Sequence, residues 1–197
     1  LPAIAAVGLL AGCVHGSASR AAPPAPVPAP VPAAFGGIAP LTATAAGAEY
    51  LVVTDLKGPA DPRLGIVELD PSGRLIAYAT LAPRSWDLAK GALPTDLESL
   101  CRLPGLALRF LAAESGQARN GHGDLFELAL EPAPSGRAAA RWRVRVTARY
   151  PLPPAAVPNR LNYEGLLCAP GRADEVRLLL ADRSGASLRT GRLQRGA

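Results

Sequence analysis

The sequence predicts an all-β fold of β-propeller-like, repeated four-stranded sheets, incomplete at about three blades, that follows a disordered N-terminal segment. Two observations carry this prediction. From about residue 36 onward, short apolar runs of strand length alternate with Gly, Pro and Asp, as in strands joined by turns. Within this region one motif is written more than once, and copies of a multi-stranded unit at a fixed period are typical of propeller blades.

The first segment, residues 1–13, is the uncharged apolar run LPAIAAVGLLAGC. It is shorter than the ~20 residues that a membrane-spanning helix needs, and it fits the apolar core of a secretion signal. Its last four residues resemble the lipobox of bacterial lipoproteins, which implies cleavage before Cys13 and attachment of a lipid to the cysteine sulfur. Several acyl chains hold a protein to a membrane far more firmly than one chain does. The alternative is a buried cysteine after an apolar strand.

The lipobox resemblance also predicts a location. Val14 follows the cysteine, where an inner-membrane lipoprotein would carry Asp, so we expect an outer-membrane lipoprotein that faces the periplasm or the cell surface. Residues 14–35 are rich in Ala and Pro, a composition that favours extended polyproline II structure. We interpret them as a linker that holds the domain of residues 36–197 away from the membrane.

Within this domain, eight segments have the length and composition of β-strands. They are residues 49–55, 64–70, 73–81, 107–115, 124–131, 141–150, 164–170 and 176–182. The second and third of them join across Asp-Pro-Ser-Gly, a favourable turn sequence.

The repeated motif contains Glu98 in DLESLCRLPGLALRFLAAESG and Glu164 in NYEGLLCAPGRADEVRLLLADRSG. Each copy has a Glu, a small residue and Leu, followed by Pro-Gly, an apolar run, an acidic residue and Ser-Gly. A weaker third copy is predicted earlier, with GGIAP (36–40) as its first part and EYLVVTDLKG (49–58) as its strand. In the three copies, taken in chain order, the apolar strand ends in Asp55, Glu114 and Asp182. The alternative is a coincidence of two acidic turns in an ordinary β-sandwich.

About three units fit in the chain, which is fewer than the ~4–8 blades of a typical propeller. An incomplete arc leaves sheet faces exposed, so we expect self-association through open blade edges.

With these residues, the sequence resembles a family of secreted bacterial β-propellers with phytase-esterase-like activity. The resemblance covers about residues 49–185 and rests on DLESL with LAAESG and on NYEGLL with LLLADRSG. It implies acidic side chains gathered at one end of a central tunnel, where related phytases hold calcium that positions phosphate esters and activates water. The matching residues here are Glu98, Glu114, Glu164, Asp182 and Asp55.

The chemistry of these acids can also be argued without the family. Carboxylates that converge at the hub repel one another unless a cation or Arg lies among them. Oxygen-only clusters select hard cations such as calcium, and a calcium site that binds phosphate oxygens supports ester hydrolysis. The flanking arginines are candidate phosphate ligands: Arg102, Arg119, Arg160 and Arg183. The alternative is a structural role, because acids near Gly turns often cap backbone N–H groups.

Two cysteines remain besides Cys13, and thiols can pair in an oxidising periplasm. Cys101 and Cys168 lie three and four residues after the matched glutamates. This offset would point them to opposite faces of corresponding strands, so the sequence leaves open a disulfide or two buried thiols.

Composition narrows the functional classes. The net charge is +5, yet the basic residues form no run interleaved with aromatics, so nucleic-acid binding is not expected. The sequence has no nucleophile elbow, zinc-protease helix motif or P-loop. The leading hypothesis is a membrane-anchored envelope lipoprotein with a propeller-like binding or assembly domain. The alternatives are a calcium-dependent, phytase-like phosphoesterase and a purely structural envelope protein.

Overall fold

The computed structural model describes residues 35–56, 61–81, 86–87, 94–116, 123–133, 142–152 and 162–194. The predicted signal with Cys13, and the linker up to residue 34, lie outside these residues. The described residues form strands β1 (Phe35–Thr44), β2 (Gly47–Thr54), β3 (Leu64–Leu69), β4 (Leu75–Leu81), β5 (Trp86–Asp87), β6 (Leu97–Arg102), β7 (Arg109–Glu114), β8 (Asp124–Pro132), β9 (Trp142–Pro151), β10 (Tyr163–Pro170), β11 (Glu175–Asp182) and β12 (Ser187–Gln194).

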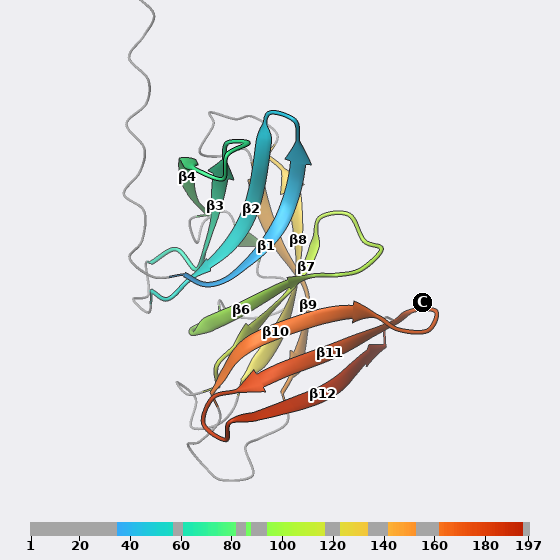
Figure 1. The fold of residues 1–197 in the computed structure, drawn as a ribbon. Helices are drawn as coiled ribbons and strands as arrows, with labels where there is room; N and C mark the ends of the chain where they lie inside the picture. Colours follow the sequence, from blue (N-terminus) through green and yellow to red (C-terminus); the bar gives the residue numbers. More distant parts are fainter. Residues whose placement is uncertain are drawn as a thin grey trace, which may run out of the picture.

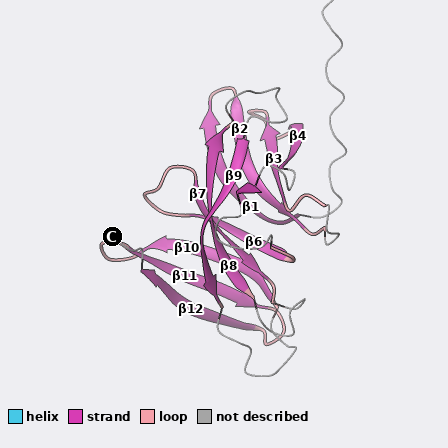
Figure 2. Cartoon of the chain, turned by 180° about the vertical axis from the view of Figure 1, so that it is seen from behind, coloured by secondary structure: helices cyan, strands magenta, loops and turns pink. Residues whose placement is uncertain are grey.

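The strands form three sheets, which confirms the all-β prediction for the described residues. The first sheet has the order β1-β2-β3-β4, the second β5-β9-β8-β7-β6 and the third β10-β11-β12. Neighbouring strands are antiparallel except for the short β5, which runs parallel to β9. The sheets follow one another through the molecule, from β1–β4 at the top of Figure 1 to β10–β12 at the bottom, and Figure 2 shows the same succession from behind. No sheet among the described residues closes on itself.

All eight strands expected from the sequence are present, with ends within two residues of the predicted bounds. Strands β1, β5, β6 and β12 were not predicted from the sequence. No helix long and apolar enough to cross a membrane occurs in the part of the chain that the structure describes.

Each sheet contains a hairpin with the same irregularity at the start of its first strand. A β-bulge adds one residue to that strand, and the bulged residues are Gly36, Glu98 and Glu164. Glu98 and Glu164 therefore occupy equivalent positions in two equivalent hairpins, as the repeated motif predicts.

The same register corrects one detail of the predicted repeat. The residue before each bulge pairs with the last residue of the second strand, and these last residues are Thr54, Glu114 and Asp182. Thr54, and not Asp55, is thus the counterpart of Glu114. The sequence comparison was displaced by one residue because the first copy has a threonine where the other two have an acid.

Alternating side chains build two apolar cores between these sheets, and Val52, Val67 and Tyr78 form a third, smaller cluster on the outer face of the first sheet. In β2, Leu51 and Val53 face the second sheet, whereas Val52 lies on the other side. In β7, Phe110 faces the first sheet and Leu111 faces the third. We call the face that a sheet turns toward the next sheet along the chain its leading face, and the opposite one its trailing face. Both internal junctions thus pack a leading face on a trailing face.

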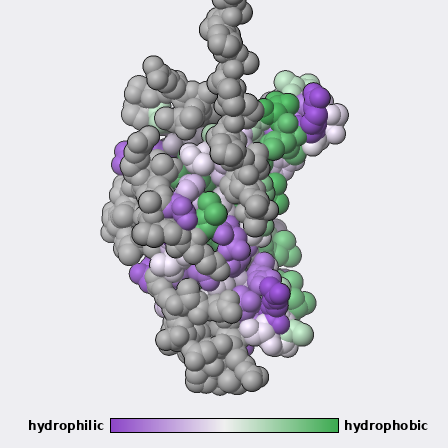
Figure 3. Space-filling view, turned by 90° about the vertical axis from the view of Figure 1, so that its left-hand side faces the viewer, coloured by the Kyte–Doolittle hydropathy of each residue, from purple (hydrophilic) through white to green (hydrophobic). Residues whose placement is uncertain are grey.

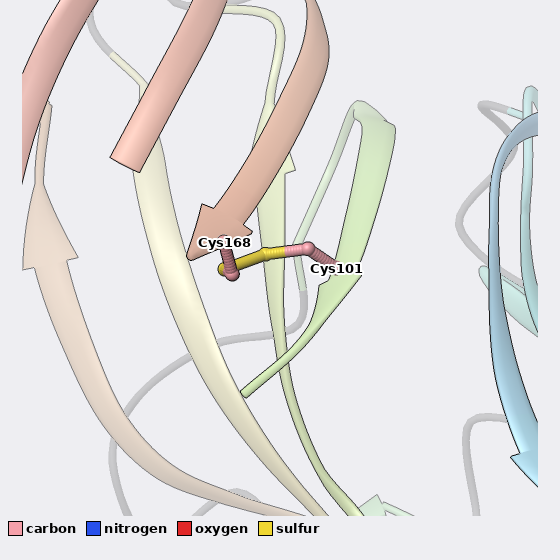
Figure 4. Close-up of a disulfide and its surroundings, with 2 residues drawn as sticks. All are labelled: Cys101 and Cys168. Carbon is pink, nitrogen blue, oxygen red and sulfur yellow. A yellow bond between two sulfur atoms is a disulfide. The ribbon is translucent and has the colours of Figure 1, made fainter. Parts of the chain in front are cut away.

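A disulfide joins Cys101 in β6 to Cys168 in β10, across a separation of 67 residues. Figure 4 shows the two side chains pointing toward one another from these strands. The one-residue offset does place the cysteines on opposite faces of corresponding strands, as the sequence analysis expected. Because the sheets stack, the leading face of β6 meets the trailing face of β10, and this offset brings the sulfurs together.

Removing this cross-link should destabilise the fold, because it closes a long loop in the unfolded chain. We expect the double variant Cys101→Ala/Cys168→Ala to lose about 2–4 kcal/mol of unfolding free energy. Urea denaturation measures the change, and reductant should lower the midpoint of the wild type but not that of the double variant. A wild type that is insensitive to reductant would contradict the expectation.

Candidate functional site

A polar pocket of about 650 Å³ lies where the three hairpins begin. The bulged residues Gly36, Glu98 and Glu164 all line it, so the repeated bulge delivers one residue of each sheet to the same pocket. The remaining lining residues are Phe35, Asp55, Asn162, Arg183 and Ser184.

The strands that deliver these residues approach one another closely. A Cβ atom on Gly36 would lie 2.7 Å from the backbone oxygen of Glu98, and one on Gly37 would lie 2.8 Å from the backbone nitrogen of Leu100. Both distances are below ordinary contact, so β1 lies against β6 with glycine at the points of contact.

Three carboxylates gather at the junction of the first and second sheets. Asp55, Asp96 and Glu98 each offer an oxygen, and these oxygens lie within 4.8 Å of one another. Asp96 is buried, Glu98 is half-buried and Asp55 is exposed, so the group opens from the protein interior toward solvent. Three carboxylates this close favour a bound cation, because like charges otherwise raise one another's energy.

Asp96 was not singled out in the sequence. The signal was present, because Asp96 begins the DLESL motif two residues before Glu98. It was masked by the second copy, which has Asn162 at the equivalent place. Two matching hydrogen bonds establish this equivalence: the Ser115 N–H donates to the Asp96 carbonyl at 3.0 Å, and the Arg183 N–H donates to the Asn162 carbonyl at 2.9 Å.

Asp96 is held by Ser115, the residue that follows β7. The Ser115 hydroxyl donates to the Asp96 carboxylate, and the Ser115 carbonyl accepts a hydrogen bond from the Tyr163 N–H at 3.0 Å. The segment that carries Asp96 is therefore fixed to the start of the third sheet as well as to its own.

A buried arginine, Arg63, ties the two acid-bearing segments together. Its Nε–H donates to the Pro94 carbonyl at 3.1 Å, two residues before Asp96, and its Nη1 donates to the Leu56 carbonyl, next to Asp55. Arg63 is thus a positioning residue that also brings a positive charge to this junction. No motif in the sequence pointed to it.

Glu164 has different neighbours from Glu98. Its carboxylate accepts hydrogen bonds from Asn162 Nδ2 at 2.9 Å and from Arg183 Nη1 at 2.7 Å. The hydrogen bond to Glu164, and then the charge of that group, raises the pKa of Arg183, with a smaller contribution from Glu98. The arginine therefore lies in the field of both glutamates.

The acids at the strand ends are used by the fold. Glu114 is buried, and its Oε1 accepts hydrogen bonds from the Thr95 N–H at 2.9 Å and the Thr95 hydroxyl at 3.1 Å. Its Oε2 accepts one from the Asp124 N–H at 3.2 Å. Asp182 is also buried and accepts a hydrogen bond from the Ser184 N–H at 3.1 Å. These two residues fit the structural alternative for the predicted acids, whereas Asp55, Glu98 and Glu164 line the pocket.

Of the predicted phosphate-binding arginines, one lines the pocket and another has a structural role. Arg183 lines the pocket. Arg102 instead donates to the backbone carbonyls of Pro40 and Leu41, at 3.5 and 3.3 Å, and so joins the first two sheets. Arg119 and Arg160 lie outside the described residues.

In comparisons with known proteins, no family model matches this sequence, no curated protein is significantly similar to it, and no solved structure matches its fold.

The two kinds of acid should respond differently to neutralisation. Glu114→Gln places an amide NH₂ against one of its N–H donors, so we expect a loss of about 2–3 kcal/mol of unfolding free energy. Glu98→Gln removes one of three crowded carboxylates, so we expect its unfolding free energy to stay within about 0.5 kcal/mol of the wild-type value. Urea denaturation in the presence of EDTA measures both. Equal losses in the two variants would contradict the assignment.

Proposed function

We propose that this chain is a membrane-anchored, cation-binding domain of the bacterial envelope, in which the three sheets are consecutive blades of an incomplete β-propeller and calcium binds to Asp55, Asp96 and Glu98. The observation that carries the proposal is the approach of these three carboxylates to within 4.8 Å of one another, beside the polar pocket. The apolar run that ends at Cys13 supports the lipid anchor, and the repeated hairpins support the blade arrangement.

The donor set suits a hard divalent cation. It consists of carboxylate oxygens alone, with no thiol or imidazole, and such sets favour calcium or magnesium over softer metals. Calcium accepts six to eight oxygen ligands in flexible geometry. Three carboxylates on two sheets, one of them buried and one exposed, match that tolerance better than the strict octahedron of magnesium.

We assign the ion to the first of the two junctions because of the charges around each glutamate. At the second junction, Asn162 and Arg183 donate to Glu164, and the arginine already supplies the positive charge there. At the first junction, Glu98 lies with two further acids, Asp55 and Asp96, and these three negative charges exceed the one positive charge that Arg63 brings there. We therefore assign the ion to Glu98 and not to its repeat partner, Glu164.

Calcium titration of the full chain, after treatment with EDTA, tests the site. We expect calcium to raise the melting temperature, because a ligand at 100 times its dissociation constant adds about 2.7 kcal/mol of stability. Asp96→Asn and Glu98→Gln should each weaken calcium binding by about tenfold or more, as measured by calorimetry. Glu164→Gln is the matched control, since it removes the equivalent carboxylate of the next repeat and should retain binding.

Two results would contradict the assignment. One is a wild type whose melting temperature does not respond to calcium. The other is an equal loss of binding in the Glu98 and Glu164 variants, which would indicate that both glutamates bind the ion.

A second candidate function is calcium-dependent hydrolysis of phosphate esters. The favouring observation is that Arg183 and Ser184 line the same pocket as Asp55 and Glu98, so a phosphate group there would have a cation on two sides. The bound ion would supply charge stabilisation and an activated water.

Turnover of p-nitrophenyl phosphate in calcium separates this function from binding alone. Activity that falls about 100-fold in Arg183→Gln while calcium binding persists would support an enzyme. Calcium binding without turnover in the wild type would leave the protein a binding module.

A further inference from the structure

On the trailing face of the first sheet, Val52, Val67 and Tyr78 are buried in a small cluster of their own, and apolar side chains of β1 beside them are exposed. An apolar hollow of about 400 Å³ lies on this face, and Figure 3 shows apolar surface, in green, along one margin of the molecule. Ile38 is 56% exposed there and Phe35 is 40% exposed. Phe35, Ile38, Val52 and Val67 are among the residues that line the hollow.

The third sheet has the complementary surface, a leading face with nothing on it among the described residues. Leu167 is 57% exposed on β10, and Leu188 is 67% exposed on β12. A hollow of about 440 Å³ lies on this face beside Leu167, and Arg177 and Arg192 flank it. Long arginine side chains can cover apolar surface with their methylene groups.

Strand register shows that these exposed residues stand at positions that are buried inside the molecule. Ile38 and Leu100 hold the same place relative to the bulge, and Leu100 is buried against the first sheet. Leu167 and Cys101 likewise hold one place, and Cys101 is buried against the third sheet. The chain thus carries both halves of a junction that it already forms twice internally.

We infer that the leading face of the third sheet in one copy covers the trailing face of the first sheet in a second copy, in a head-to-tail contact. The contact repeats the packing seen between the first and second sheets and between the second and third. A head-to-tail contact joins two or more copies, and it closes into a ring when the rotation between neighbouring copies divides a full turn. The inference rests on the equivalence of the faces and is independent of the cation site.

The test measures the mass of the full chain in solution by light scattering after gel filtration, over a range of concentrations. We expect the wild type to associate. Ile38→Asp places a charge on the trailing face and Leu167→Asp places one on the leading face. The concentration at which half of the chains are associated should therefore be about tenfold or more higher in each variant than in the wild type. More than half of each side chain is exposed in the monomer, so both variants should fold, which circular dichroism checks.

Mixing the two variants identifies the contact. The Ile38→Asp chain keeps a good leading face and the Leu167→Asp chain keeps a good trailing face, so the mixture should form a one-to-one complex. Ala45→Asp adds the same charge at the exposed turn between β1 and β2, where Ala45 lines neither hollow, and should associate like the wild type.

Several results would overturn the inference. They are a wild type that stays monomeric, association that neither substitution weakens, a mixture that forms no complex, and association lost in Ile38→Asp alone, which would indicate two trailing faces packed on each other.

Discussion

The structure depends on how closely the first strands of successive hairpins can approach. Gly36 and Gly37 let the backbone of β1 lie against β6, and Cys101 fastens β6 to β10 on the other side. A side chain at either glycine would push the first sheet outward and separate Asp55 from Asp96 and Glu98. The contact that holds the sheets together therefore also sets the spacing of the acidic group.

The same β-bulge presents a residue with different surroundings in each of the three hairpins. The bulge position is held by Gly36, Glu98 and Glu164. The glycine provides a close contact, the first glutamate lies among acids, and the second is bound by an arginine. The three bulges share one backbone geometry and differ in the charge of the residue that they carry. Equivalence of position is thus a guide to where a residue lies and a poor guide to what it does.

Much of the fold could be predicted from the sequence, because apolar runs of strand length and the repeated Glu motif are local signals. The site was harder, since it depends on register. The first copy has Thr54 where the other two have an acid, so the next acid, Asp55, was aligned with Glu114 in its place. Asp96 was overlooked because the second copy has Asn162 at this place. Arg63 was overlooked because it acts through backbone carbonyls, one of which, that of Pro94, is 31 residues away.

The bond between Cys101 and Cys168 makes one covalent loop of the chain from β6 to β10, and β7, β8 and β9 lie wholly within it. A single break in the backbone anywhere inside that loop would leave the two pieces attached. Such a nicked molecule would migrate as intact until its sulfurs were reduced. The connecting segments of the second sheet can therefore be cut without the third sheet being lost.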